Sequence, residues 1–476
     1  MSEDTDQLLL DIADYVAAPE DFTAVAYQTA RLSLIDSLGC AVLAASHRAC
    51  QQLLLPVVPE AVLAGGARVP GTSMQLDPVQ GAFILGSLIR WLDYNDTWLA
   101  SEWGHPSDNL GGILAVADYL SRRRAAAGQD PLHIRDVLNA LINAYEIQGV
   151  LALENSFNQL GLDHVILVRV ASAAIVTQLL GGSRAHIVSA VSHAWIDGDP
   201  LRVYRHSPNV GPRKSWAAGD ATSRGVWLAL MAMRGEPGYP TALTTPNWGY
   251  QDALNRGRVL ARPRPFGSYI VENVLFKVSY PAEFHAQTSV EAAVRLHDQV
   301  GNRVDSIERI VIETQQPALR IIDKRGPLRN PADRDHCLQY VVAVGLLRGD
   351  LTADDYEDEA ARDPRIDFLR ERMEVMENPR YSRDYLDEEK RSVANALQVF
   401  FTDGTSTEQV QIEYPIGHPR RRQEAEPLLW RKFQANLAAR LPEHQVEAIL
   451  SACSDPAALD AWPVHNFIDL FVFKPD

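Results

Sequence analysis

Cysteine is scarce in this sequence: there are four in 476 residues, and no two lie closer than ten positions. An iron–sulfur cluster needs several thiolates close together, so no cluster of this kind is expected. Four cysteines over this length also make no disulfide framework. Long apolar runs are lacking too. The longest, residues 226–233, has eight residues, whereas a bilayer-spanning helix needs roughly 20. The acidic N-terminus lacks the pattern of a secretory signal. These absences favour a cytoplasmic protein outside the membrane.

Positive charge is in short supply, with 45 Lys and Arg against 61 Asp and Glu, a net charge of −16. Nucleic acids and anionic membranes are bound by basic faces, so neither is an expected partner. Zinc-protease, nucleotide-binding and nucleophile-elbow motifs are missing. The sequence therefore predicts acid–base chemistry on a small anionic substrate, with no cofactor and no metal.

Apolar residues at helical spacing dominate the first half of the chain. The helices that this spacing predicts are 23–45, 79–92, 111–124, 136–153, 165–180, 184–195 and 215–234. A proline- and glycine-containing stretch, residues 261–269, is the expected linker.

The character of the sequence changes near residue 275. The β-branched segment 307–313 predicts a strand, and segments 396–401 and 409–414 flank a glycine-containing turn typical of a hairpin. Helices are expected at 287–299, 336–347, 428–441 and 446–453, and the acidic segment 350–390 is interpreted as a solvated helical surface. The predicted fold is mainly α, with a large all-helical domain (1–270), a smaller α/β lid domain (271–415) and C-terminal helices (416–476) that rejoin the first domain.

The densest group of chemically capable residues is WLDYNDTWLASEWGHPSDNLGG, residues 91–112, which contains Asp93, Asp96, Thr97 and His105. Pro106 favours an extended backbone at His105. Ser107 or Asp108 is expected to cap a helix that starts near Leu110. His105 would then precede a helix N-terminus, where anions are favoured. The alternative is a structural loop with capping carboxylates.

A cationic segment, residues 201–215, offers a binding site for carboxylates. No acidic residue occurs between Asp199 and Asp220, whereas Arg213 and Lys214 are present. Arginine binds carboxylates in a bidentate manner. His164 at the start of an apolar helix and Lys277 near the expected domain junction are further candidates, although each residue type also serves structural roles.

The segment RWLDYNDTWLASEWGHPSDNLGGILA resembles the hallmark segment of the MmgE/PrpD family, and DPRIDFLRERMEVMENPRYSRDYLDEEKRSVANALQVFF is similar to the same family. The resemblance covers nearly the whole chain. It implies a helical domain with an α/β lid, and a hydro-lyase of the methylcitrate cycle of propionate breakdown that works without an iron–sulfur cluster.

The resemblance also implies roles for particular residues. The D-x-x-D-T pattern of related cis-aconitate decarboxylases corresponds to Asp93, Asp96 and Thr97, and the H-P-S element to His105. Further matching positions are His164, Lys214 and Lys277. The expected catalytic residues are His105, His164, Asp93 and Lys214, and the expected substrate-binding residues are Thr97, Arg213 and Lys277. Of these, Arg213 is chosen from the cationic segment and matches no position of the family pattern.

The implied reaction is elimination of water from 2-methylcitrate, a tricarboxylate, with hydration of cis-aconitate as a side activity. His105 and His164 are the expected acid–base pair, without assignment of which is which. The lysine and arginine side chains would neutralise substrate carboxylates. Alternatives are cis-aconitate decarboxylation, epimerisation of a dicarboxylate, a metal-dependent hydro-lyase, or a helical scaffold without chemistry. A homodimer is left open.

Overall fold

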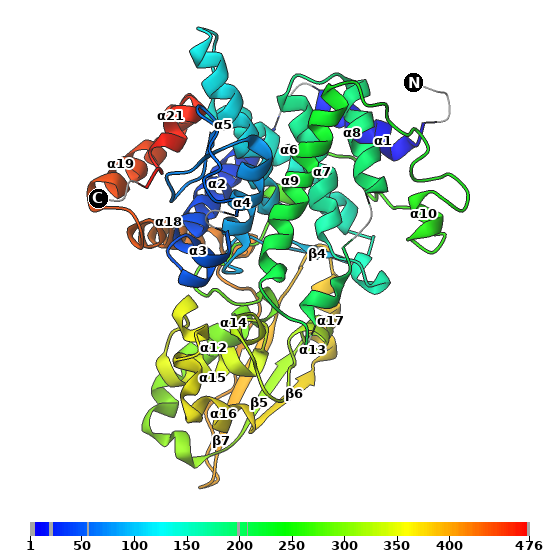
Figure 1. Cartoon of the computed structure of the whole chain (residues 1–476). Coiled ribbons are helices and arrows are strands. Elements are labelled where there is room, and N and C mark those ends of the chain that lie inside the picture. The colour runs from blue at the N-terminus through cyan, green and yellow to red at the C-terminus, as the bar shows by residue number, and fades with distance from the viewer. Residues whose placement is uncertain (1–4, 19–21, 55–56, 198–199, 207, 474–476) are drawn as a thin grey trace. The chain divides into compact units, whose positions relative to one another are not determined.

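The computed structural model describes residues 5–18, 22–54, 57–197, 200–206 and 208–473 (Figure 1). Contacts group the chain into two compact units. The helical unit comprises residues 1–203, 213–274 and 429–476, and the α/β unit comprises residues 204–212 and 275–428. The mainly α fold class, with a smaller α/β part, is confirmed. The three domain ranges inferred from the sequence stay a prediction.

The first part of the helical unit contains the helices predicted from the apolar spacing and some further helices. They are α1 (Gln7–Ala17), α2 (Ala24–Ala44), α3 (Arg48–Leu54), α4 (Pro78–Arg90), α5 (Leu110–Ala126), α6 (Ile134–Ala152), α7 (Val165–Leu179), α8 (Arg184–Ile196), α9 (Arg213–Met233), α10 (Tyr250–Ala253) and α11 (Tyr269–Asn273). Of these, α1, α3, α10 and α11 were not predicted. The C-terminal part contributes α18 (Arg422–Ala438), which belongs to this unit from residue 429 onward, and α19 (Glu443–Ser454), α20 (Pro456–Asp460) and α21 (Val464–Asp469). Two short hairpins are β1 (Ala67–Arg68) with β2 (Gln75–Leu76), and β3 (Trp98–Leu99) with β4 (Trp103–Gly104).

Glycines allow three helices of this unit to approach one another closely. A Cβ atom at Gly219 of α9 would lie 2.2 Å from the carbonyl oxygen of Phe83 in α4, and one at Gly111 of α5 would lie 2.6 Å from the backbone nitrogen of Gly86. Only glycine permits such contact between backbones. The crossings hold together the C-terminal end of α4 and the N-terminal ends of α5 and α9, which carry the candidate site.

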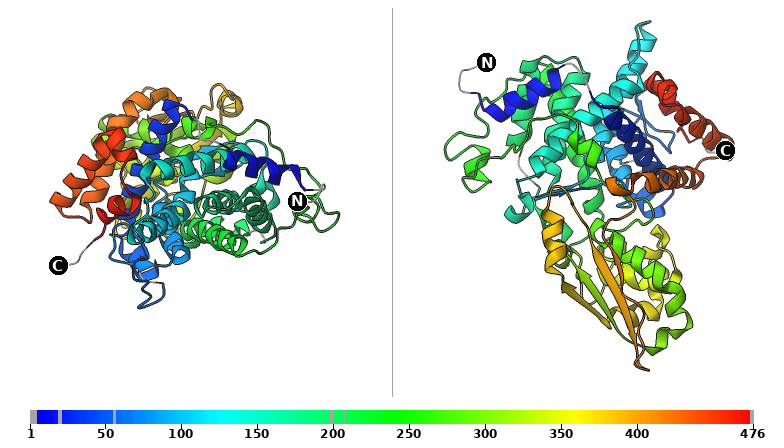
Figure 2. Two further views of the ribbon diagram at one scale, coloured as in Figure 1. Left: turned by 90° about the horizontal axis from the view of Figure 1, so that it is seen from above. Right: turned by 180° about the vertical axis from the view of Figure 1, so that it is seen from behind.

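The α/β unit is a four-stranded sheet with helices packed on one face (Figure 2, right). The strand order is β6-β5-β7-β8, with β5 and β6 parallel and the other pairs antiparallel. Ile310 and Ile312 of β5 are fully buried, and they belong to a core shared with Leu296 of α12 and Val341 of α15. The alternation of buried and more exposed residues along β5 is that of a sheet with one covered face.

The elements of the α/β unit are as follows. The strands are β5 (Ile307–Thr314), β6 (Met373–Glu377), β7 (Asn395–Phe401) and β8 (Val410–Ile412), and the helices are α12 (Gln287–Val300), α13 (Gln316–Ile321), α14 (Pro331–Arg334), α15 (Leu338–Arg348), α16 (Pro364–Arg370) and α17 (Pro379–Leu386). The interpretation of segment 350–390 as a helical surface is therefore wrong in part. It contains strand β6, whose glutamates at positions 374 and 377 interrupt the apolar run that is usual for a parallel strand.

The described residues include no single helix long and apolar enough to cross a membrane. One bent pair, Ala24–Ala44 with Arg48–Leu54, passes on length and composition alone. Most residues of Ala24–Ala44 are buried within the helical unit.

Candidate active site

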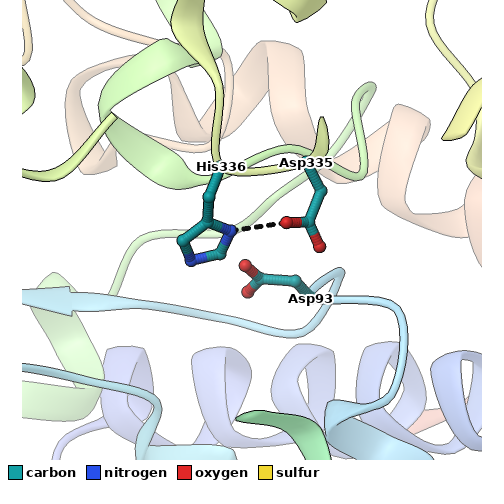
Figure 3. A group of neighbouring side chains, drawn as sticks. All are labelled: Asp93, Asp335 and His336. Carbon is teal, nitrogen blue, oxygen red and sulfur yellow. Dashed lines mark hydrogen bonds and ion pairs between the residues drawn. The ribbon is translucent and has the colours of Figure 1, made fainter. Parts of the chain in front are cut away.

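Asp93 lies on the loop that follows α4 and is the centre of the candidate site (Figure 3). Its side chain is buried and forms an ion pair with Arg90, in the last turn of α4. The backbone at Asp93 has a φ of 50°, a left-handed conformation that is costly for a residue with a side chain. Such strain at a non-glycine residue is typical of functional positions, where the side chain is needed in spite of its cost.

The imidazole of His105 lies next to Asp93. Its Nδ1 donates a hydrogen bond of 2.6 Å to the backbone oxygen of Asp96, and its Nε2 is 3.9 Å from Oδ1 of Asp93. The hydroxyl of Thr97 is 3.4 Å from Nδ1. The bond to a carbonyl places a proton on Nδ1, so Nε2 carries the lone pair of the neutral ring. His105 is therefore held in the tautomer that a general base requires.

Lys214 reaches the same carboxylate from α9. Its ammonium nitrogen is 4.0 Å from Oδ2 of Asp93, and the residue is 1% exposed. His105 and Lys214, which are remote in the sequence, thus flank one aspartate. The guanidinium of the neighbouring Arg213 is half exposed, lies 4.3 Å from the ring centroid of Trp216 and is 3.9 Å from Asp220.

Asp96 stabilises the loop that carries Asp93 and His105 through hydrogen bonds of its side chain. Its Oδ1 accepts hydrogen bonds from the backbone nitrogen and the hydroxyl of Ser107, at 3.2 and 2.6 Å, and its other oxygen accepts one from Tyr145. Burial raises the pKa of Asp96 to about 6, against the effect of these hydrogen bonds. Because both carboxylate oxygens of Asp96 accept hydrogen bonds from Ser107 and Tyr145, we assign Asp96 a structural role. The expectation that Ser107 or Asp108 caps α5 is wrong, since both lie inside a 3-10 helix, residues 106–109.

His164 lies immediately before α7, and its ring centroid is 5.9 Å from that of His105. The residue is 5% exposed. Its Nδ1 is 3.1 Å from Oδ1 of Asp163, a fully buried carboxylate. Asp163 was not predicted as a site residue, although its position beside His164 was an available signal.

The C-terminal helix α18 also reaches this loop. The ammonium nitrogen of Lys432 is 2.7 Å from Oδ1 of Asp36 in α2 and donates a hydrogen bond of 2.7 Å to the backbone oxygen of Tyr94. Tyr94 directly follows Asp93 in the chain. Lys432 therefore holds the backbone beside the central aspartate, a contact that no sequence pattern had indicated.

Glu102, in the turn between β3 and β4, is a second buried carboxyl near the site. Its Oε2 accepts hydrogen bonds from the backbone nitrogen and the side chain of Asn158, at 2.7 and 2.9 Å. Burial is the main cause that raises its pKa from 4.5 to about 7, although Arg202 acts in the opposite direction. Folding therefore favours the protonated form of this carboxyl relative to the unfolded chain.

Because of this raised pKa, we expect Glu102 to make the free energy of unfolding depend on pH. The Glu102→Gln variant should lack this contribution. A carboxyl whose pKa is higher in the folded state stabilises the fold while protonated, and this contribution is lost as the pH rises from about 4.5 through about 7. Relative to wild type, Glu102→Gln should gain on the order of 2 kcal/mol in free energy of unfolding between pH 4.5 and 8. Urea unfolding measures the difference. The exposed Glu154→Gln is the control, and a difference independent of pH would contradict the prediction.

Lys277 lies in the α/β unit, where it is almost fully buried. Lys277 acts on the carboxyl group of Glu283. Burial raises the pKa of this carboxyl, but the nearby His285, His336 and Lys277 have a larger effect in the opposite direction, so the pKa of Glu283 is lowered. His285 Nδ1 is 2.8 Å from a carboxylate oxygen of Glu283, and its Nε2 is 3.2 Å from the hydroxyl of Tyr385. Lys277 thus belongs to a polar cluster of its own unit.

Asp335 and His336 form a further pair in the α/β unit that the sequence analysis missed. His336 Nδ1 is 2.6 Å from Oδ1 of Asp335 (Figure 3). Both residue types bind metal ions. Neither unit, taken alone, contains a group of three such ligands among the residues described here.

The chain matches the two domains of one known protein family. The MmgE/PrpD N-terminal domain matches residues 10–262, and the MmgE/PrpD C-terminal domain matches residues 280–456. The chain belongs to the MmgE/PrpD family, which confirms the resemblance seen in the sequence.

Individual relatives match over almost the full length. The 2-methylcitrate dehydratase of Cupriavidus necator is 59% identical over 471 residues, which are 98% of this chain and 97% of the relative. That of Escherichia coli strain K12 is 57% identical with the same coverage. The mitochondrial 2-methylcitrate dehydratase of Yarrowia lipolytica is 52% identical, over 99% of this chain and 91% of the relative.

Proposed function

We propose that this chain is a hydro-lyase that removes water from 2-methylcitrate to give 2-methyl-cis-aconitate. The observation that carries the proposal is that relatives named 2-methylcitrate dehydratase match 98% of the chain at 59% and 57% identity. The buried group of His105, His164, Asp93 and Lys214 supports it, because it contains the acid, base and cation that a dehydration needs. A scaffold protein without chemistry would have no need to bury these charges together.

The elimination breaks a C–H bond and a C–O bond in one substrate. The proton leaves a carbon next to a carboxylate and is weakly acidic, so cations must offset the charge that develops. Lys214 is the proposed cation of the helical unit, and Arg213 and Lys277 are further proposed substrate-binding residues. The two imidazoles serve as the acid–base pair. The carbonyl group of Asp96 orients His105 through Nδ1. Asp93 is proposed to hold the Lys214 cation beside Nε2 of His105. Thr97 is proposed to donate a hydrogen bond to the substrate.

An ultraviolet assay on synthetic 2-methylcitrate in the presence of a chelator tests the function. The expected result is a rise in alkene absorbance that the chelator does not reduce. Activity abolished by chelation and restored by a divalent metal would replace the metal-free mechanism with a metal-dependent one. Parallel incubation with cis-aconitate separates the alternatives within the family, because carbon dioxide release indicates decarboxylation and a loss of absorbance indicates hydration.

This reaction belongs to the methylcitrate cycle of propionate breakdown, and we propose a cytoplasmic enzyme. The expected consequence is that a strain without the gene grows on succinate but not on propionate. We further propose a homodimer, which sedimentation equilibrium would show as twice the mass of one chain.

A further inference from the structure

Asp163 is a buried carboxylate whose immediate partner is the candidate catalytic imidazole of His164. Its Oδ1 lies 3.1 Å from Nδ1 of His164 and accepts a hydrogen bond of 3.3 Å from the backbone nitrogen of Val165, the first residue of α7. The residue has no exposed surface. A buried carboxylate favours the charged form of a histidine within about 4 Å, because each ion compensates the desolvation of the other.

The surroundings of His105 are different. Its Nδ1 faces a neutral acceptor, the carbonyl group of Asp96. The carboxylate of Asp93, near Nε2, also faces the cations Arg90 and Lys214, so that the sum of these three charges is positive. A positive surrounding disfavours a second proton on His105.

The other charged groups near His164 do not change this difference between the surroundings of His164 and those of His105. Glu102, which interacts electrostatically with Asp163, faces Arg202 at 4.0 Å. Arg169, farther along α7, donates a hydrogen bond to the carbonyl oxygen of Ala194 and lies 4.0 Å from Asp197. The two rings are 5.9 Å apart between centroids, so a proton on one imidazole disfavours a proton on the other.

We infer that Asp163 is a positioning residue that holds His164 as the imidazolium, which makes His164 the general acid and His105 the general base. The inference rests on the proposed dehydration. Nε2 of His105 accepts the proton from the substrate carbon, and the C–H electron pair becomes the new double bond. The C–O bond breaks, its electron pair leaves with the hydroxyl group, and Nε2–H of His164 protonates that group so that water departs. His105 then returns its proton to solvent and His164 takes one up.

Nitrogen-15 NMR of histidine-labelled full-length protein tests the protonation states without substrate. His164→Gln and His105→Gln assign the two signals. The expected result is a higher pKa for His164 than for His105, and a decrease of at least about one unit for His164 in Asp163→Asn. A higher pKa for His105 in the wild type would overturn the inference. This experiment decides the proton assignment even if 2-methylcitrate is not the substrate, which the ultraviolet assay reports separately.

Kinetics of Asp163→Asn test the catalytic consequence. Asparagine keeps an oxygen that can cap α7, but it has no charge, and its amide can donate to Nδ1 and favour the opposite tautomer of His164. We expect kcat to fall at least ~10-fold, and the alkaline limb of the kcat/KM profile to move at least about one pH unit lower. The acid limb, which reports His105, should not move.

Asp77→Asn is the matched control. Asp77 caps α4 through hydrogen bonds of 2.9 and 3.1 Å from the backbone nitrogens of Val79 and Gln80. This variant therefore makes the same change at a helix cap whose hydrogen-bond partners, among the residues that the structure describes, include no histidine. It should keep kcat within about twofold and both limbs in place, because asparagine caps helices about as well as aspartate. An Asp163→Asn enzyme with the same behaviour would reduce Asp163 to a helix cap and refute the inference.

Discussion

Replacing His105 with alanine should lower kcat for dehydration by at least ~100-fold, because a positioned acid or base contributes about that much or more. The fall should be equal in kcat and kcat/KM, since proton transfer occurs only in the transition state. Steady-state kinetics with 2-methylcitrate provide the measurement. The structure supports a direct role: the ring is 8% exposed, and its Nε2 faces Asp93 while its Nδ1 is bound to a carbonyl oxygen.

A second substitution separates chemistry from structure at this position. His105→Asn places an amide donor near the position of Nδ1, so it can preserve the hydrogen bond to the backbone oxygen of Asp96, but it has no equivalent of Nε2. If Nε2 is the base, His105→Asn should be as inactive as His105→Ala. Recovery of near-normal kcat in His105→Asn would assign His105 to the support of the loop. The exposed His444→Ala should retain full activity.

Replacing Lys432 with methionine should lower the free energy of unfolding of the helical unit by about 3–5 kcal/mol. The ion pair between Lys432 and Asp36 is almost fully buried, with side chains 3% and 2% exposed, and removal of one partner leaves the other charge uncompensated in the interior. Urea unfolding followed by tryptophan fluorescence is the measurement. All nine tryptophans of the sequence lie in the helical unit, so the signal reports the unit that carries the pair.

A double variant tests this explanation. Asp36→Leu combined with Lys432→Met removes both charges and should recover most of the lost stability. It cannot restore the hydrogen bond to the backbone oxygen of Tyr94, so kcat should stay below that of wild type. Arg431→Met changes an exposed neighbour on the same helix and should alter stability by less than about 0.5 kcal/mol. A single Lys432→Met variant with wild-type stability would contradict the account of the buried pair.

Elements with a strong local pattern were predicted well. Helix α7 was expected at 165–180 and covers Val165–Leu179, and strand β5 was expected at 307–313 and covers Ile307–Thr314. Strand β6 was missed, because its sequence MEVME carries glutamates where a parallel strand is usually apolar. Its place in the sheet depends on pairing with β5, which lies outside any short window of sequence.

For the candidate site, the sequence proposed residues but could not indicate their partners in the fold. His105, His164, Asp93 and Lys214 were all chosen from the sequence, and all four are buried in the helical unit. Arg213 was chosen from the same cationic segment as Lys214, and its side chain lies against Trp216. Successive residues of a helix point about 100° apart, so the orientation of α9, which sequence spacing does not give, directs Lys214 to Asp93.

The sequence by itself determined the helical ranges, the strand-rich middle and the chemical groups available, because these depend on residue type and on spacing over a few positions. Only the tertiary structure decided that Lys432 supports the loop at Tyr94 and that His105 and Lys214 flank Asp93. The physical reason is that such contacts depend on how closely helices cross. At α4, α5 and α9 this distance is set by glycines whose missing side chains let the backbones meet.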